Sequence, residues 1–384
     1  MAVSSKANYV MLKWARKTAG LSIEDVAVAE TWPVEKIEEW EQGDRSPSLP
    51  QLRRLAKRYK RPLMVFYLPE PPTDFNVVKD FRRLPEHAAK KLSPGLRYAL
   101  RTAQERQRWA AEYLRDEGEP SFALVGSATV KDDTTQLGKQ LREFLGVSVH
   151  DQVTCQSASQ AYGVWKTACE TAGIFVFQAS GIDVTEFRGC ALPDTYAPVA
   201  LVNARDSYTA RTFTLLHEIA HILLGISAIT GGTHPPLDSR KGTIEYFCNS
   251  LAAEVLIPRD DLAQNLPKGW QQDDKRAVAD AAKRYHVSRL AMAVRLVEIG
   301  AADKSWLASR WQYFKSKPSE PSSGPVPQYI RAAARNGAAF SRLAVSAYEA
   351  GYIHGGQLTA LLHLSLKHLG RLVQQLYPNR VETP

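Results

Sequence analysis

The chain has 384 residues, of which 44% are hydrophobic, so we expect a globular protein of two or three domains. No apolar run approaches the roughly 18 residues that a membrane helix needs, and no charged-then-apolar leader opens the chain. We therefore expect neither a membrane protein nor an exported one. The net charge of +9 favours an anionic partner.

The four cysteines are scattered along the chain and show no C-x-x-C spacing. They are Cys155, Cys169, Cys190 and Cys248. This pattern argues against a disulfide framework and predicts reduced thiols in a cytoplasmic protein.

Residues 1–72 contain short helical patterns separated by turn signals. The patterns cover Tyr9–Ala19, a stretch that begins after Ser22, Val34–Trp40 and Leu49–Tyr59. Short helices with a tight turn between the second and the third predict a helix-turn-helix domain. The run Trp40-Glu-Gln-Gly43-Asp-Arg45-Ser-Pro47 resembles the XRE (Cro/repressor-like) family.

The third of these helices, which stands in the recognition position, is acidic. Its acids and the one that follows are Glu35, Glu38, Glu39, Glu41 and Asp44, against the single base Lys36. Unless the acids point away, such a face repels DNA phosphates, so we expect DNA binding to be weak. Nearby bases are candidates for phosphate contacts, or alternatively form a solvated helix face: Arg45, Arg53, Arg54 and Lys57. The sequence therefore favours a protein-docking or oligomerisation role for the domain, with DNA binding as the alternative.

Residues 73–125 are predicted to form a linker and a spacer helix that runs from Ser93 to Arg115. Amphipathic patterns then predict helices over 133–145 and 156–172, followed by strands over 174–177, 186–192 and 199–202. The small sheet can cover a core, and its edge strand can also pair with an extended peptide.

The stretch from Arg211 to Gly225 is predicted to be a buried helix that carries a zinc site. His217 and His221 are four residues apart, so they share one face of the helix and can bind one Zn²⁺. Glu218 stands beside the metal at this offset and suits a general base. Without a compensating metal ion, burying these polar groups in an apolar helix would be costly.

A catalytic zinc site normally takes three protein ligands. The helical pattern from Thr243 to Pro258 offers Glu245 as the best candidate, because it lies early in the helix. Cys248 is the rival, since thiolates also bind zinc, but a single cysteine in an apolar stretch is more often a core residue. Glu254 points elsewhere by spacing and is the third option, or a salt-bridge partner.

Two further residues are candidates for stabilising the transition state. His234 lies in the loop between the two ligand-bearing helices, and Tyr246 follows Glu245. A solvated loop histidine is the alternative for His234, and Tyr246 carries the same ambiguity.

The run Arg211–His221, followed by Glu245-x-x-x-Asn249-x-x-Ala252-Ala253-Glu254-x-x-x-Pro258, resembles the ImmA/IrrE zinc metallopeptidases. The stretches 187–193 and 199–203 look like strands of the same family. The resemblance is strong over a domain that we place at 126–265. It implies that His217, His221 and Glu245 are ligands, that Glu218 is the catalytic base, and that a helix-turn-helix repressor is the substrate.

The remainder of the chain is predicted to be helical, apart from one linker. Residues 266–314 form a helical extension, 315–327 a Pro- and Ser-rich flexible linker, and 328–384 a C-terminal helical region whose leucines serve a core or an interface.

These patterns predict a mostly helical α+β protein: an intracellular zinc endopeptidase that cuts a repressor or an antitoxin. The alternative is a DNA-binding regulator or antitoxin-like interaction protein whose zinc site is structural or vestigial. Glu218 argues against the alternative, because a structural zinc site needs no base.

Overall fold

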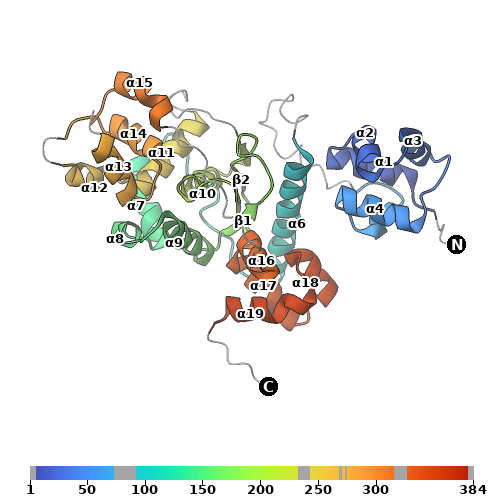
Figure 1. The fold of residues 1–384 in the computed structure, drawn as a ribbon. Helices are drawn as coiled ribbons and strands as arrows, with labels where there is room; N and C mark the ends of the chain where they lie inside the picture. The colour runs from blue at the N-terminus through green and yellow to red at the C-terminus, as the bar shows by residue number, and fades with distance from the viewer. Residues whose placement is uncertain are drawn as a thin grey trace. The chain divides into compact units, whose positions relative to one another are not determined.

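The structure is a computed structural model that describes residues 6–72, 92–231, 243–267, 270–272, 275–314 and 327–378. The chain divides into two compact units, Met1–Thr102 and Ala103–Pro384. The described helices and strands are drawn in Figure 1. They form a mostly helical α+β protein with one small sheet, which confirms the predicted fold class.

The first unit contains the predicted short helices. They are α1 (Tyr9–Ala19), α2 (Ile23–Glu30), α3 (Val34–Gln42), α4 (Leu49–Tyr59) and the 3-10 helix η1 (Leu63–Tyr67). Ser22 and Asp25 form a capping box that begins α2. The helices surround their own core, which includes Leu12, Ile37, Trp40, Leu52, Tyr59 and Phe66.

A buried ion pair ties α1 to α3. The Arg16 guanidinium donates from Nε to Glu41 Oε1 and from a second nitrogen to Oε2, each over 2.7 Å. Glu41 is therefore held inside the domain, and the structure corrects its assignment to the acidic recognition face. The bidentate hydrogen bonds between the guanidinium and the carboxylate compensate for the loss of water around both charges.

The second unit contains a four-stranded mixed sheet, with helices before and after the strands along the chain. Helix α6 (Pro94–Asp116) begins in the first unit, and α7 (Thr134–Leu145), α8 (Val149–Val153) and α9 (Ala158–Thr171) follow. The sheet order is β1 (Phe175–Ala179), β3 (Val199–Asn203), β2 (Gly189–Leu192) and β4 (Ala228–Thr230). β1 and β3 are parallel, whereas β2 is antiparallel to both β3 and β4.

Three strands lie where the sequence predicts them, but the pattern does not predict β4. This strand has three residues, all only partly buried, so it shows neither a long apolar run nor a clear alternation. Its conformation depends on pairing with β2, in which Thr230 stands opposite Gly189.

Helix α10 (Tyr208–Leu223) lies at the centre of the second unit. It packs against α9, strands β2 and β3, and α11 (Ile244–Leu256), which in turn packs against α7. Beyond α10, Gly225 has a left-handed φ of 65°, and a Cβ there would lie 3.2 Å from the Gly126 Cα. A glycine at this position lets the chain leave the helix beside another loop.

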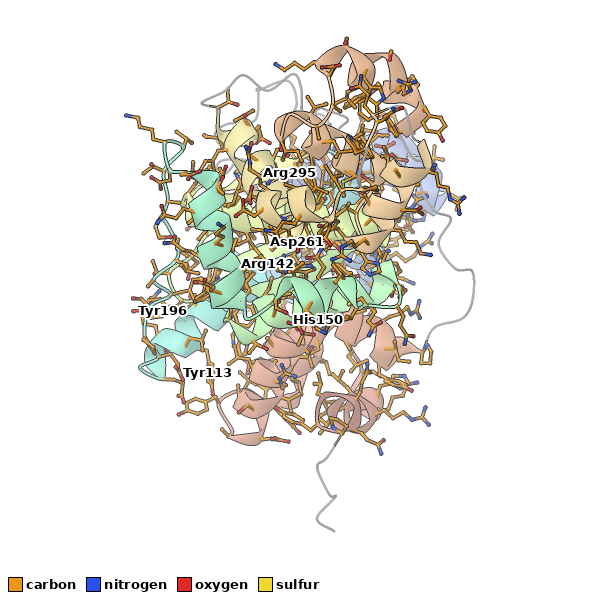
Figure 2. The ribbon with its side chains drawn as sticks, turned by 90° about the vertical axis from the view of Figure 1, so that its left-hand side faces the viewer. Tyr113, Arg142, His150, Tyr196, Asp261 and Arg295 are labelled. Atoms are coloured by element: carbon orange, nitrogen blue, oxygen red, sulfur yellow. The ribbon has the colours of Figure 1, made fainter. Side chains whose placement is uncertain are left out.

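Helices α12 (Arg259–Asn265), α13 (Lys275–Arg284), α14 (Arg289–Glu298) and α15 (Lys304–Phe314) complete this core. Apolar residues from α10 and α11 share one cluster with Met292 and Trp306, so the core continues past residue 265. Figure 2 labels Arg142 on α7 and Arg295 on α14. Both are buried guanidinium groups that bond to the end of α11: Arg142 to the Val255 carbonyl and Arg295 to the Ile257 carbonyl.

The C-terminal helices pack on the sheet. They are α16 (Gln328–Asn336), α17 (Ala338–Glu349), α18 (Gly355–Leu362), the 3-10 helix η3 (Leu366–His368) and α19 (Leu369–Leu376). Helix α16 lies against β1 (Figure 1), and the Phe340 ring meets the rings of Phe175 and Phe177. The predicted linker at 315–327 falls outside the described residues, except for Pro327.

None of the described helices combines the length and the apolar character that crossing a bilayer requires. All four cysteines are buried free thiols.

We predict that the buried pair between Arg295 and Glu254 stabilises the junction of α11 and α14. Both side chains are 3% exposed, and the Glu254 carboxylate also accepts the Arg259 backbone N–H. Glu254→Ala should lower the free energy of unfolding by about 3–5 kcal/mol, because it leaves a buried guanidinium without its main partner. Urea denaturation followed by circular dichroism measures this change.

Asp260→Ala is the matched control for that variant. Asp260 pairs with Lys139 in solvent, so its removal should leave the unfolding curve nearly unchanged. Equal losses in the two variants would contradict the assigned role of the buried pair.

Candidate metal centre

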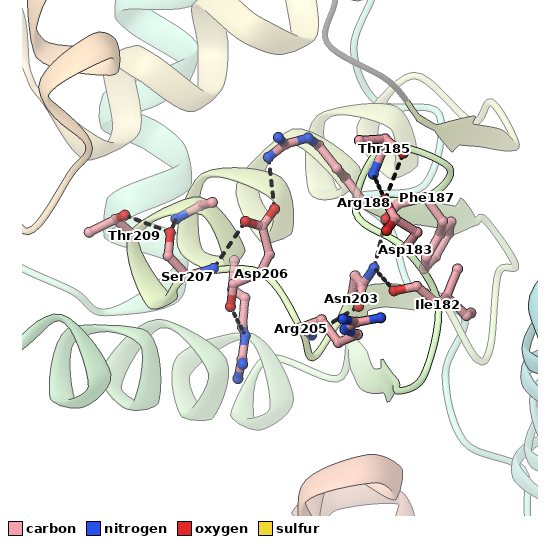
Figure 3. A network of polar contacts seen from close by, with 12 residues as sticks. Ile182, Asp183, Thr185, Phe187, Arg188, Asn203, Arg205, Asp206, Ser207 and Thr209 are labelled. Carbon is pink, nitrogen blue, oxygen red and sulfur yellow. Dashed lines mark hydrogen bonds and ion pairs between the residues drawn. The ribbon is translucent and has the colours of Figure 1, made fainter. Parts of the chain in front are cut away.

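A polar network fixes the turn that leads from β3 into α10 (Figure 3). The buried Asn203 side chain donates to the carbonyls of Ile182 and Phe187, over 3.1 and 2.8 Å. Arg188 donates to Asp206 over 2.7 Å. Ser207 then begins the helix, because its hydroxyl accepts the Ala210 N–H.

Arg211 anchors the first turn of α10 to the same loop. Its guanidinium donates to the carbonyls of Asp206 and Ala204 and lies 4.5 Å over the Tyr208 ring. These contacts set the position of the helix before its buried polar residues begin.

His217 and His221 lie on one face of α10, as their spacing predicts. Both are buried, and their Nε2 atoms are 3.2 Å apart. The Glu245 carboxylate approaches them from α11, with one oxygen 3.4 Å from His217 Nε2 and the other 3.5 Å from His221 Nε2. One donor atom from each of the three residues lies within 4.8 Å of the others.

Glu245 reaches this position because α11 begins just before it. The Thr243 hydroxyl accepts the Tyr246 N–H and caps the helix, which places Glu245 in the first turn. Its side chain is 56% exposed, so the cluster is buried on the histidine side and open on the Glu245 side. Burial raises the pKa of Glu245, but hydrogen bonds and charges from His217 and His221 outweigh it and hold the pKa below its usual value.

The His217 ring carries opposing influences. Burial lowers its pKa, whereas the Glu245 hydrogen bond and the nearby carboxylates raise it, and the net direction is upward. The Asn249 side chain also raises the pKa of His217. The family-like run in the sequence includes Asn249, but no role is predicted for it there. Its position one turn after Glu245 is the signal that could have identified it.

Glu218 is fully buried next to the two histidines. Neither of its carboxylate oxygens has a hydrogen-bond partner within the part of the chain that the structure describes. Burial raises the pKa of Glu218 to about 7, against the opposing effect of His217 and of the Thr230 hydroxyl. A buried carboxyl without a fixed partner is available for proton transfer.

The residues present fit a metal ion. Two imidazole nitrogens and a carboxylate form a common donor set for zinc. The two Nε2 atoms face each other at short range, and a shared cation satisfies both lone pairs when the rings are neutral. The side of the cluster at Glu245 is open, which leaves room for a further ligand such as water or a substrate oxygen.

The two rivals for the third position lie elsewhere. Cys248 is buried, and burial, with the charges of Glu245 and Glu218, raises the pKa of its thiol far above the usual value. It is not part of the donor cluster found among the described residues. Glu254 is engaged with Arg295 and the Arg259 N–H, which is the salt-bridge alternative that the sequence indicates.

The two candidates for transition-state stabilisation are placed differently. His234 lies outside the described residues. Tyr246 is partly exposed on α11 beside Glu245.

The surface of the helix-turn-helix region is a second candidate site. Glu35 and Glu38 are exposed on α3, and Glu39 lies 3.5 Å from Arg45. Arg54 donates to the Glu30 carboxylate over 2.7 Å and stacks on Trp32. This guanidinium, predicted to contact phosphate, is therefore bound within the domain. The remaining two predicted contacts, Arg53 and Lys57, are exposed on α4.

Two family models match the chain. Residues 169–297 match the Peptidase_M78 model, described as the IrrE N-terminal-like domain, and residues 10–63 match a model described as a helix-turn-helix domain. The comparison with curated proteins gave no match. The first model spans the sheet and helices α10, α11 and α14, and the second spans α1 to α4. The chain therefore carries an IrrE N-terminal-like domain of the ImmA/IrrE family, preceded by a helix-turn-helix domain of the XRE type.

Proposed function

We propose that the chain is a zinc-dependent endopeptidase that cuts a regulatory protein. The observation that carries the proposal is the convergence of His217, His221 and Glu245 on one point. Beside them lies the buried Glu218, whose carboxylate has no hydrogen-bond partner among the residues that the structure describes. The family match supports a protease or regulator of the ImmA/IrrE type. In this proposal the first three residues are zinc ligands and Glu218 is the general base.

Glu218 performs the proton transfers. A bound zinc ion supplies a Lewis acid that polarises the peptide carbonyl and makes a water molecule more acidic. Glu218 accepts the proton of the attacking water and then returns it to the leaving amine nitrogen.

The peptide substrate pairs with the edge of the sheet. β4 is the last strand in the described order and pairs on one side with β2. An extended peptide can add to its other side through backbone hydrogen bonds. β4 ends at Thr230, whose hydroxyl lowers the pKa of the Glu218 carboxyl. A peptide that pairs with β4 therefore lies near the metal centre.

The proposed substrate is a helix-turn-helix repressor or an antitoxin. This substrate class rests on the resemblance to the ImmA/IrrE peptidases and on the XRE-type domain of the chain itself, which offers a surface for pairing with a similar fold. We propose that residues 1–68 recruit or gate the substrate.

A DNA-binding regulator is the second candidate, and the helix-turn-helix match favours it. In that case the metal site is structural or vestigial. Glu218 argues against a structural site, because such a site gains nothing from a buried carboxyl that has no partner among the described residues.

We predict that the purified protein binds about one zinc ion per chain. His217→Ala and His221→Ala should each lose most of the metal, and Glu245→Ala should weaken its affinity, because each variant removes a donor. Elemental analysis and chelator competition measure these changes. His150→Ala, at an exposed position on α8, is the matched control and should keep its zinc.

Two outcomes would overturn the metal assignment. Wild-type protein that cannot bind added zinc would eliminate the site. Unchanged affinity in Glu245→Ala would move the third ligand to another residue.

Glu218→Gln is predicted to keep zinc and to lower the rate of cleavage by about 10²–10⁴-fold, because it removes the base but no ligand. In cells, the same variant should abolish the response of the target gene. A normal response would show that proteolysis is not the function and would favour the regulator.

We also predict that the helix-turn-helix domain binds DNA weakly, with a steep salt dependence and little sequence preference. The acids on α3 cause this, so Glu35→Lys with Glu38→Lys should strengthen DNA binding in a fluorescence anisotropy titration. Glu119→Lys with Glu143→Lys is the charge-matched control at exposed positions outside this domain. Tight, sequence-specific binding by the wild-type protein at physiological salt would contradict the prediction.

A further inference from the structure

We propose that Gly189 and Thr230, opposite each other on β2 and β4, position the Glu218 carboxylate. The proposal rests on the proposed function, in which Glu218 is the base. Gly189 supplies the space for the carboxylate, and Thr230 supplies a hydroxyl that donates a hydrogen bond to it. Both residues act on the reaction through the Glu218 side chain, so both are positioning residues.

The space at Gly189 carries the first step. A Cβ at this position would lie 2.5 Å from Glu218 Oε1 and 3.0 Å from its Cδ. It would also lie 2.5 Å from the Thr214 Cγ2, one turn earlier on α10. Gly189 is buried, as are the other residues of β2, so the carboxylate packs directly against the strand at this position. The glycine is required here for close approach.

Thr230 carries the second step. Its hydroxyl oxygen is buried and has no hydrogen-bond partner within the described residues. The same holds for both carboxylate oxygens of Glu218. An unmade hydrogen bond is costly for both groups when they are buried. Thr230 pairs with Gly189, whose Cβ position lies 2.5 Å from Glu218 Oε1, so Thr230 lies on the neighbouring strand beside this carboxylate. A donor and an acceptor that lack other partners thus lie together.

The strand register places Gly189 and Thr230 opposite each other, next to the Glu218 carboxylate. Thr230 is the residue that β4 pairs with Gly189, so the hydroxyl stands across the ladder from the vacant Cβ position. A peptide that adds to β4 would stabilise this strand and with it the hydroxyl. Substrate binding and the orientation of the base are therefore coupled through β4.

The first test is Gly189→Ala in the full-length, zinc-loaded protein. We expect unchanged zinc content, a cooperative thermal unfolding transition, and a kcat about 10²-fold lower with little change in KM, since the base is displaced and the ligands are not. Gly163→Ala on α9, where a Cβ meets nothing within 4 Å, is the matched control and should retain full activity.

A double variant separates the carboxylate from simple packing. Thr214→Ser removes the methyl group that a Cβ at 189 would meet, but leaves the contact with Glu218. Gly189→Ala with Thr214→Ser should therefore stay impaired. Full recovery of kcat would show that Gly189 only makes room for Thr214, and the proposal would fail at this residue.

Thr230→Val tests the hydroxyl without changing the shape of the side chain. We expect kcat to fall by roughly tenfold, with zinc affinity and KM unchanged, and Thr230→Ser to recover most of the loss because it restores the donor. In metal-free protein, the infrared band of the Glu218 carboxyl, assigned with Glu218→Gln, should shift in Thr230→Val. An unchanged band and an unchanged kcat would overturn the role of Thr230.

These outcomes are distinguishable from a failure of the proposed function. If Glu218→Gln remains active, the base is wrongly assigned and the proposed function fails. If Glu218→Gln is inactive while Gly189→Ala and Thr230→Val match the wild type, the function stands and the positioning proposal fails.

Discussion

The burial of three polar side chains within the apolar helix α10 is the constraint on which the second unit depends. His217, Glu218 and His221 are each 3% exposed or less, and the residues between and around them belong to the main core. Such burial is unfavourable for ionisable groups unless partners compensate for the lost water. Glu245 from α11 supplies part of the compensation for the histidines, and the proposed zinc ion would supply the remainder. Glu218 keeps no such partner among the described residues, which suits the proton transfers proposed for it.

The surroundings of α10 hold this arrangement by fixing both of its ends. At the N-terminal end, Asn203 donates to the Ile182 carbonyl and Asp206 accepts from Arg188, both of which precede β2. Arg211 donates to the Asp206 carbonyl in the turn after β3. Past the C-terminal end, Gly225 lets the chain turn back into β4, which rejoins the sheet beside β2. Helix α10, which carries Glu218, and strand β4 are thus consecutive in the chain. The buried guanidinium groups of Arg142 and Arg295 fix the far end of α11 in the same way.

The helix-turn-helix domain shows how pairing changes the meaning of charge. By sequence, the recognition helix has five acids in and just after it, yet Glu41 is buried against Arg16 and Glu39 lies near Arg45. Glu35 and Glu38 remain exposed, so the face is less acidic than its composition suggests but still unfavourable for phosphate. On the basic side, Arg54 is held by Glu30 and Trp32. Both observations reduce the part of the domain that is available to DNA.

The features that depend on local spacing follow from the order of the amino acids alone. A separation of four residues places His217 and His221 on one face of any helix, and the cap at Thr243 and the stop at Pro258 bound α11. The three longer strands and most helices follow from periodicity and turn residues in the same way.

Tertiary structure alone decided which residues from separate segments meet. It brought Glu245, and not Cys248 or Glu254, to the histidines, because the approach of α11 to α10 is set by packing along both helices. It also decided that β4 forms, that Gly189 faces Glu218 and that Glu41 is buried. Each of these depends on contacts between residues far apart in the chain, for which a periodic pattern holds no information.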